Sequence, residues 1–376
     1  ALAFDNDSTF PFLDDIMKNR SVLFLGEAGH YDTATTQIKV NMISYLNDKG
    51  VHSALFEITP FISSYVFSCP EYDNFTKDWQ IQSFFSMWLG HQPFQSLFEK
   101  IKKRQITVFG IDSHAGFHDI RAVRAILHKY TTNEPFILDW DKLDRYYIDR
   151  LVLGKEMPEK EQFEMMQMID SISTYTQYLI NKKGKNMDLE SLIQWQRNIN
   201  TMFSYNLYVV PYEDSIWDES FNMRNIELSI RNRDSQMAEN ILWMTEHFPN
   251  EKFTVWSASY HGAKDISLTM HPKDSLLYFI QQCAGEGVYN KLGDKFYSLA
   301  ITSLQDNSDN PIELLEDAIS KQTNDAPYAF IDFVPLRYAD GFRDKEFGAS
   351  MIKKKRGKWL YIFDGIYYIG NRQAND

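Results

Sequence analysis

The chain has 376 residues, 44% hydrophobic and 15% aromatic, which is enough for the core of one large α/β domain or two average ones. Its 39 basic and 51 acidic residues give a formal net charge of −12. This charge argues against a nucleic-acid partner, since a surface that binds phosphates is normally basic. No run of about twenty apolar residues occurs, so we expect no membrane span.

The compartment is predicted from the start of the chain and from its cysteines. The chain begins at Ala1 without a methionine, which fits either a mature exported protein or a trimmed expression product. We expect a periplasmic or secreted protein after removal of a signal peptide, with a cytoplasmic location as the alternative. Cys69 and Cys283 are too few for a disulfide scaffold, and the sequence does not show whether they pair or which oligomer forms.

Four short apolar runs are each followed by an acidic residue or a histidine. They are Val22–Leu25 before Glu27 and His30, Ser53–Phe56 before Glu57, Ile106–Ile111 before Asp112 and His114, and Phe253–Trp256 before His261. Such runs are typical of strands that are buried on both faces of a sheet. Because the carboxyl ends of parallel strands open on one crevice, we expect these acids and histidines to converge there.

The segments between the runs predict an α/β fold with a mostly parallel central sheet flanked by helices. Residues 33–49 have apolar side chains at helical spacing, with Asp32 or Thr33 available to cap the start and Gly50 the end. A helix between two strands in this way forms a βαβ unit. Further strands are expected at 297–302 and 328–333.

We expect residues 1–376 to form a single α/β domain with a helical insertion at 140–225. Within the insertion, apolar residues recur every three positions from Phe163 to Tyr175, which we interpret as a packing stripe. Two β-rich runs flank Asp364 and Gly365 near the end of the chain. Because an Asp-Gly pair suits a type I′ turn, residues 357–372 are predicted to form a C-terminal β-hairpin.

Glu27 and His30 are three residues apart, so they can touch if the turn after the first strand is helical. A carboxylate beside an imidazole fixes its tautomer and raises its basicity, as a general base acting on water requires. In one chemistry that fits, His30 is this base and His261 polarises or protonates the substrate oxygen. In the other, a divalent metal is held by a mixed nitrogen and oxygen set from Glu27, His30, Glu57, Asp112, His114 and His261.

Three further residues are candidates for substrate binding. Lys39 and Arg233 can steer an anionic group, although Arg233 can instead pair with Asp234 and brace its helix. Trp88 belongs to an aromatic segment that either lines the cleft or, as the stronger alternative, seals a core.

Several segments resemble motifs of the erythromycin esterase family, in the same order. The first is Leu25-Gly26-Glu27-Ala28-Gly29-His30, which resembles the Gly-Glu-Ala-Thr-His-Gly signature of that family. The others are Leu55–Glu57, Phe109–Asp112, the Arg-Asp-x-x-Met-Ala-x-Asn segment from Arg233 to Asn240, and Val255–His261, which resembles Val-Trp-Ala-His-Asn-Ala-His. The resemblance runs from about residue 20 to 265 and, more weakly, to 335.

The resemblance implies an α/β core and metal-free hydrolysis of an ester or lactone, with no cofactor. By position, His30 activates water, with Glu27, Glu57 and His261 as its companions. Asp112, His114, Lys39, Arg233 and Trp88 are the expected substrate-binding residues.

Three departures from the family pattern argue against a macrolide as the native substrate. Gly29 stands where the family has threonine, Tyr31 where it has glycine, and Ala258 where it has the first histidine of a late pair. The expected partner is a small-molecule ester or lactone. One alternative is a metal-dependent hydrolase that uses Glu27, His30, Glu57 and His261, since the wider superfamily includes haem-uptake and Tiki-type relatives. The other is a catalytically lapsed binding protein of a polysaccharide or antibiotic-response pathway.

Overall fold

The computed structural model describes residues 2–4, 8–30, 32–58, 86–113, 119–131, 136–204, 219–270, 282–303, 314–352 and 355–370. The chain divides into two compact units. Unit 1 contains residues 1–56, 85–107 and 241–376, and unit 2 contains residues 57–84 and 108–240. The chain enters unit 2 within β4 (Thr107–Gly110) and returns to unit 1 within α12 (Glu219–His247).

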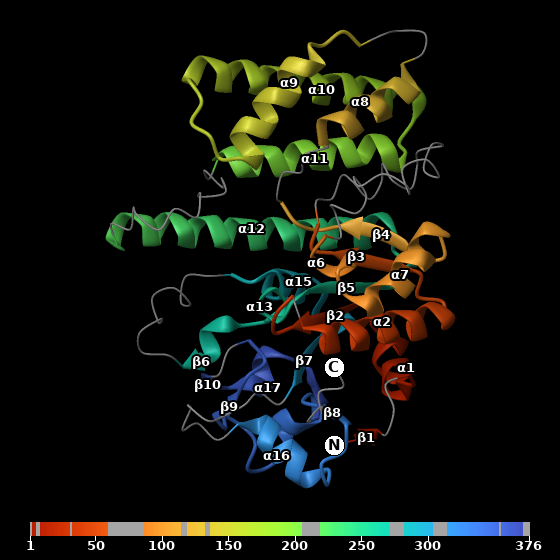
Figure 1. Ribbon diagram of the computed structural model, residues 1–376, viewed down its shortest axis with the longest axis vertical. Helices are drawn as coiled ribbons and strands as arrows, with labels where there is room; N and C mark the ends of the chain where they lie inside the picture. The colour runs from red at the N-terminus through yellow and green to blue at the C-terminus, as the bar shows by residue number, and fades with distance from the viewer. Residues whose placement is uncertain are drawn as a thin grey trace. The chain divides into compact units, whose positions relative to one another are not determined.

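Unit 1 is built on a mainly parallel sheet, as the sequence predicts (Figure 1). Its strands in spatial order are β1 (Leu2–Phe4), β8 (Tyr328–Asp332), β11 (Gly365–Ile369), β7 (Phe296–Ser303), β2 (Val22–Glu27), β5 (Phe253–Ala258) and β3 (Ser53–Phe56). The strands from β11 to β3 run parallel, whereas β8 is antiparallel to both β11 and β1. The sheet is strongly apolar because both of its faces are covered.

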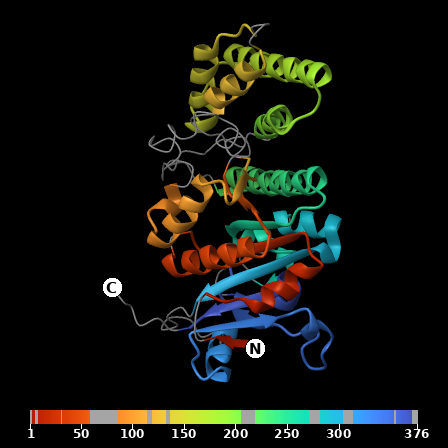
Figure 2. The same cartoon turned by 90° about the vertical axis from the view of Figure 1, so that its right-hand side faces the viewer.

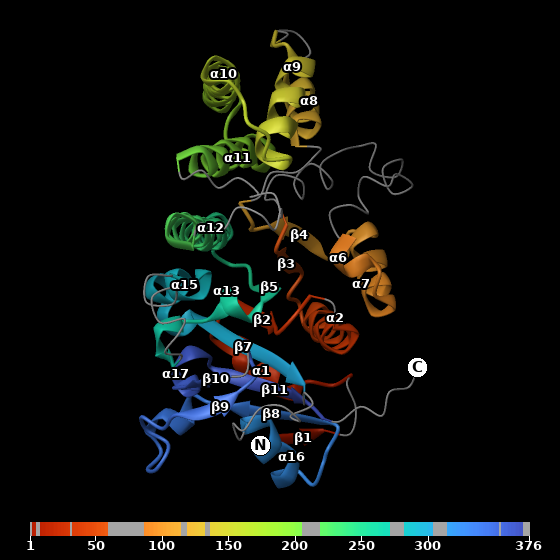
Figure 3. The same ribbon diagram turned by 60° about the vertical axis from the view of Figure 1, so that its left-hand side comes forward.

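Helices cover both faces of this sheet. Figure 3 shows α2 (Thr33–Asp48) on one side and α13 (Ser259–Gly262) with α15 (Ala284–Leu292) on the other. Figure 2 shows α7 (Gln92–Lys102) beside α2. The remaining helical segments of unit 1 are α1 (Pro11–Lys18), α6 (Ser86–Leu89), η2 (Ile266–Leu268), η3 (Gly293–Lys295), α16 (Leu315–Gln322), η4 (Pro335–Tyr338) and α17 (Trp359–Ile362).

The predicted caps of α2 are confirmed. The Asp32 side chain accepts hydrogen bonds from the backbone N–H groups of Ala34 and Thr35, at 3.0 and 3.3 Å. These bonds satisfy donors that have no partner inside the helix. At the other end Gly50 has a φ of 90°, the left-handed conformation with which many helices end. The first cap fixes where α2 begins after β2, and the second fixes where it ends.

The turn from β5 into α13 packs tightly against β2 because two glycines allow it. A Cβ atom on Gly26 would lie 2.7 Å from the Cα and Oγ atoms of Ser259. A Cβ atom on Gly262 would lie 2.5 Å from the ring of Phe24. Any larger residue at position 26 would therefore push α13 away from the end of β2.

The predicted hairpin at 357–372 is wrong in its residues. Residues 359–362 form α17, and β11 lies between β7 and β8 in the sheet. Asp364 is buried and accepts hydrogen bonds from the Ser298 N–H, at 2.9 Å, and from Arg337 Nη2, at 2.7 Å, so it cannot occupy an exposed turn. A small antiparallel hairpin lies just before it, formed by β9 (Phe347–Ala349) and β10 (Lys355–Gly357), with β6 (Thr269–Met270) paired to β10.

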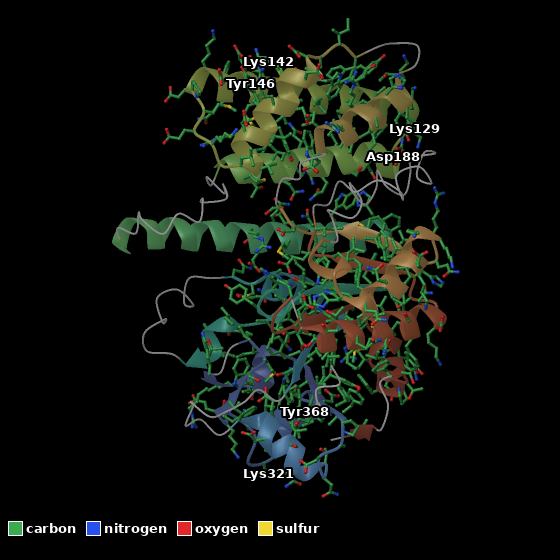
Figure 4. The ribbon with its side chains drawn as sticks, in the orientation of Figure 1. Lys129, Lys142, Tyr146, Asp188, Lys321 and Tyr368 are labelled. Atoms are coloured by element: carbon green, nitrogen blue, oxygen red, sulfur yellow. The ribbon has the colours of Figure 1, made fainter. Side chains whose placement is uncertain are left out.

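Apart from the end of β4, the regular elements of unit 2 are helical in its described residues. Its elements are α8 (Asp119–Tyr130), α9 (Trp140–Tyr147), the π-helical segment η1 (Ile148–Val152), α10 (Glu159–Lys183), α11 (Met187–Ser204) and the part of α12 up to residue 240. Residues from α8 to α11 form an apolar core. Figure 4 labels Lys129 and Asp188, an ion pair of this unit with 2.7 Å between Nζ and Oδ2. The single-domain organisation and the insertion at 140–225 stay predictions.

The packing stripe predicted along α10 is only partly right. Ile169 and Ile172 are buried, but Phe163 is 63% exposed, whereas Met165 is completely buried. A helix turns every 3.6 residues, so a strict three-residue repeat moves around the helix and leaves the core.

Among the described residues, no helix combines the length and the apolar character that crossing a membrane requires. His114, Cys69 and Tyr31 lie outside the described residues.

Candidate active site

Glu27 is the last residue of β2 and is 1% exposed. Its strand is paired in parallel with β5 on one side and β7 on the other, with Glu27 in register with Ala258 and Ile301. A carboxylate is therefore held at the carboxyl edge of the sheet of unit 1, where open α/β sheets bind ligands.

His30 contacts Glu27, as their spacing predicts. Its Nδ1 atom lies 2.7 Å from Glu27 Oε1. The imidazole side chain is 26% exposed, whereas the carboxylate beneath it is almost completely buried. The pair thus presents an imidazole to the outside while its carboxylate is kept from water.

Lys39 is the second partner of Glu27, and it is fully buried on α2. Its ammonium donates to Glu27 Oε2 at 2.8 Å and to the backbone oxygen of Ser257 at 3.1 Å. The same Nζ atom lies 4.7 Å from the centre of the Trp256 ring, in cation–π geometry. The predicted role of Lys39 in steering an anionic group stays a prediction, since Nζ is directed at Glu27 in this structure.

The charges of this group settle the protonation of Glu27. Burial by itself raises the pKa of the Glu27 carboxyl, but the ammonium of Lys39 and the hydrogen bond from His30 outweigh it and lower the pKa below the ordinary value. Glu27 is therefore ionised at neutral pH and can only accept hydrogen bonds. It follows that Nδ1 of His30 donates to Glu27.

Trp88 belongs to an aromatic cluster beside His30. Its ring meets the imidazole edge-on, with 6.3 Å between centroids and 79° between planes, and also packs against Phe56, Phe94 and Trp256. Trp88 is completely buried. The stronger of the two alternatives for this residue, sealing a core, describes its surroundings, and its contact with His30 helps to hold the ring.

Unit 2 holds a second charged group, in which Glu57 and Asp112 share Arg233. Arg233 donates from Nε and Nη2 to the two oxygens of Asp112, at 2.9 and 2.8 Å, and from Nη2 to Glu57 Oε1 at 2.8 Å. Both acids are buried. Although burial opposes the charge of Arg233, Asp112 and Glu57 raise its pKa further above the ordinary value, so the guanidinium is permanently charged.

The structure brings six of the predicted site residues together in two groups, one within each unit. Glu27, His30 and Lys39 come together in unit 1, and Glu57, Asp112 and Arg233 come together in unit 2. A single crevice that contains both groups stays a prediction.

His261 lies on α13, is 6% exposed and packs edge-to-face on Tyr260. Its catalytic role stays a prediction. Among the residues that the structure describes, no three His, Cys, Asp or Glu side chains are grouped so that they could hold a metal ion.

Sequence reasoning missed a buried polar network around Asn240 in unit 2. Asn240 donates to the backbone oxygen of Ile111, at 2.8 Å, and to Asn198 Oδ1, at 3.1 Å, and its own oxygen accepts from Gln194 and Gln236. Asn240 lies seven residues after Arg233, two helical turns along one face of α12. This spacing was the signal that the two residues act on the same neighbour, the end of β4.

The chain resembles three solved structures at low sequence identity. A Bacillus cereus protein is 16% identical with a TM-score of 0.69, over 98% of this chain and 93% of its own. A succinoglycan biosynthesis protein is 14% identical (TM-score 0.65, 98% and 93%), and a mutant of the erythromycin esterase EreC in its open conformation is 14% identical (TM-score 0.61, 97% and 95%). No protein-family model and no curated protein matches the sequence. These likenesses show a shared fold and a distant relationship of structure.

Proposed function

We propose that the protein is a hydrolase of ester or lactone bonds in which His30 activates water. The observation that carries the proposal is the 2.7 Å contact between Glu27 and His30, with a buried carboxylate and a partly exposed imidazole. Because Nδ1 of His30 donates to Glu27, Nε2 of the neutral ring is the atom that takes a proton from a water molecule as that water attacks the carbonyl carbon. The fold shared with an erythromycin esterase supports the same chemistry.

The proposed substrate is a small ester or lactone other than a macrolide. The proposal follows the three departures at Gly29, Tyr31 and Ala258 from the esterase pattern. In the proposed reaction the hydroxide that forms from water adds to the carbonyl carbon, and the alkoxide leaves with a proton. The imidazolium of His30, after it has taken the proton from water, is the nearest source of that proton.

The test is hydrolysis of a panel of esters and lactones by the protein and by His30→Ala. Loss of a general base typically costs about 10²- to 10⁴-fold, and we expect kcat/KM to fall in that range while the circular dichroism spectrum is unchanged. His52→Ala is the matched control, because His52 precedes β3 at the opposite end of the strands and is exposed. Equal activity of His30→Ala and the protein would end the proposal.

A second candidate function is a polysaccharide-pathway protein that has kept the fold and lost the reaction. It is favoured by Ala258, which stands beside Glu27 where the esterase pattern has a histidine, and by the shared fold of a succinoglycan biosynthesis protein. Hydrolysis of any member of the panel, lost in His30→Ala, would contradict this candidate.

A further inference from the structure

We infer that Lys39 is a positioning residue that selects the tautomer of His30 by acting through Glu27. The inference rests on the proposed role of His30 as a base, and it assigns to Lys39 no contact with the substrate.

One carboxylate links the two side chains. Glu27 Oε1 accepts from His30, and Oε2 accepts from Lys39. The ammonium is anchored on its far side by the Ser257 carbonyl oxygen and by the face of the Trp256 ring. Each oxygen therefore has a fixed partner, and the carboxylate cannot rotate without breaking one of these bonds.

The charge of Lys39 decides whether Glu27 carries a proton. A carboxyl group that is 1% exposed is driven towards its neutral form by desolvation, and an ammonium at 2.8 Å is the strongest opposing influence in its surroundings. Lys39 is itself fully buried, and a buried ammonium requires a carboxylate partner. The two residues thus keep each other charged.

The protonation of Glu27 in turn decides which nitrogen of His30 carries its proton. An ionised carboxylate only accepts, so it binds the tautomer with the proton on Nδ1 and leaves Nε2 basic. A protonated Glu27 can donate to Nδ1 instead, and the ring proton then sits on Nε2. That second tautomer has no lone pair on the nitrogen that faces away from Glu27, so it cannot accept a proton from water there.

The experiment measures the tautomer of His30 by ¹⁵N chemical shifts of the imidazole, at a pH where the ring is neutral. The His30→Asn spectrum identifies its signals among the nine histidines. We expect the proton on Nδ1 in the protein and in Lys39→Arg, and a shift of the population towards Nε2 in Lys39→Met and Lys39→Gln. With the member of the ester and lactone panel that the protein hydrolyses fastest, kcat of these two variants should fall at least about tenfold, while KM stays within about twofold.

Three results would overturn the inference. The first is a ring proton on Nε2 in the unmodified protein, which requires no variant. The second is an unchanged tautomer in a folded Lys39→Met or Lys39→Gln variant, and the third is a shift of the same size in Lys49→Met. Lys49 is the matched control, because it is a lysine at the C-cap of the same helix that is 52% exposed and pairs with Asp14 instead of Glu27.

The tautomer does not depend on turnover, so the two proposals fail separately. A tautomer shift without any detectable hydrolysis contradicts the proposed function and leaves the role of Lys39 standing. Hydrolysis that depends on His30, together with an unchanged tautomer in Lys39→Gln, supports the proposed function and contradicts the role of Lys39.

Discussion

Glu316 is a buried acid that the sequence alone does not single out. It is completely buried on α16, and its Oε1 atom accepts from the backbone N–H and hydroxyl of Ser350, both at 2.8 Å, and from Thr302 at 3.2 Å. Burial raises the pKa of Glu316 despite these bonds. Burial raises the pKa of Tyr368, and the charge of Glu316 is one of the smaller contributions in the same direction. Figure 4 labels Tyr368 and Lys321 of α16.

Because the folded protein holds the Glu316 proton more tightly than the unfolded chain, stability should fall as pH rises. The loss begins near the unfolded pKa of about 4.3 and is complete above the raised folded value. We expect Glu316→Gln, which cannot ionise, to lack this fall and to be at least as stable as the protein at pH 7. Urea unfolding between pH 4.5 and 8 measures the difference.

Asp340→Asn is the control for Glu316→Gln, because it removes an exposed carboxylate of the same unit. It should leave the pH dependence almost as it is in the protein. A Glu316→Gln protein that loses stability with pH as steeply as the unmodified protein would refute the explanation.

At the scale of residues, sequence reasoning found contacts that depend on spacing along the chain. The three-residue step from Glu27 to His30 is local, so it predicts their contact before any fold is known. Lys39 is different, because its burial depends on Glu27 and Ser257, which arrive from two other elements. A lysine three residues before buried Met42 was the available sign that it faces the core.

At the scale of elements, two polar side chains of α12 hold the end of β4 in unit 2 by hydrogen bonds, and we call them anchors. Arg233 holds Asp112, the second residue after β4, and Asn240 holds the carbonyl of Ile111, the first. Met237, between the two anchors, is completely buried. The Arg-Asp-x-x-Met-Ala-x-Asn segment is thus one helical face that fixes the position of an acid after a strand.

This arrangement predicts a large cost for Asn240→Leu. The substitution leaves the Ile111 carbonyl and the amides of Gln194 and Gln236 without their partner in a buried place, at about 1–3 kcal/mol for each buried group. We expect the free energy of unfolding to fall by roughly 3 kcal/mol or more. Urea denaturation followed by circular dichroism measures it.

Asn181→Leu is the comparison, since Asn181 is an exposed residue of α10 that bonds only to a neighbouring glutamine in the same helix. Exposed substitutions of this kind change stability by about 0.5 kcal/mol or less. If both variants lost the same free energy of unfolding, the buried hydrogen bonds around Asn240 would not contribute more to stability than an exposed side chain does.

Helices and strands were predicted correctly where their pattern is local in the sequence. They were predicted wrongly where contacts with a distant strand determine the structure. The strands β2, β3, β4, β5, β7 and β8 and the caps of α2 follow from short apolar runs and capping residues. The Asp-Gly pair at 364 and 365 has the chemistry of a turn, but burial of Asp364 against Ser298 and Arg337 overrides it. The basic residues from Lys353 to Lys358 predict a solvated turn, whereas Lys355 among them is buried in β10.

At the scale of the whole molecule, the fold is shared by chains of very different sequence. The three similar structures share only 14–16% of residues with this chain, yet align over 97–98% of it. The sequence therefore predicts the mainly parallel sheet well, because many different apolar residues fill it. It predicts the chemistry less well, because a reaction depends on a few side chains and the shared sheet does not determine which residues these are.

We expect the hydrolysis to survive removal of metal ions. In the proposed mechanism Glu27 and His30 supply the base, so no step requires a Lewis acid. The measurement is the rate of hydrolysis of the best substrate of the panel before and after dialysis against a strong chelator. Activity that disappears on dialysis and returns with one divalent ion would favour the metal-dependent alternative, with Glu27 and His30 as the first ligands to test.

The register between β2 and β5 makes position 258 a natural point of evolutionary change. Parallel strands lie about 4.8 Å apart, and residues in register point to the same face, so any side chain at 258 starts beside Glu27. In the proposed mechanism, the residue at 258 thus decides whether a second imidazole can stand beside the carboxylate of Glu27 while the pairing of β2 with β5 stays the same.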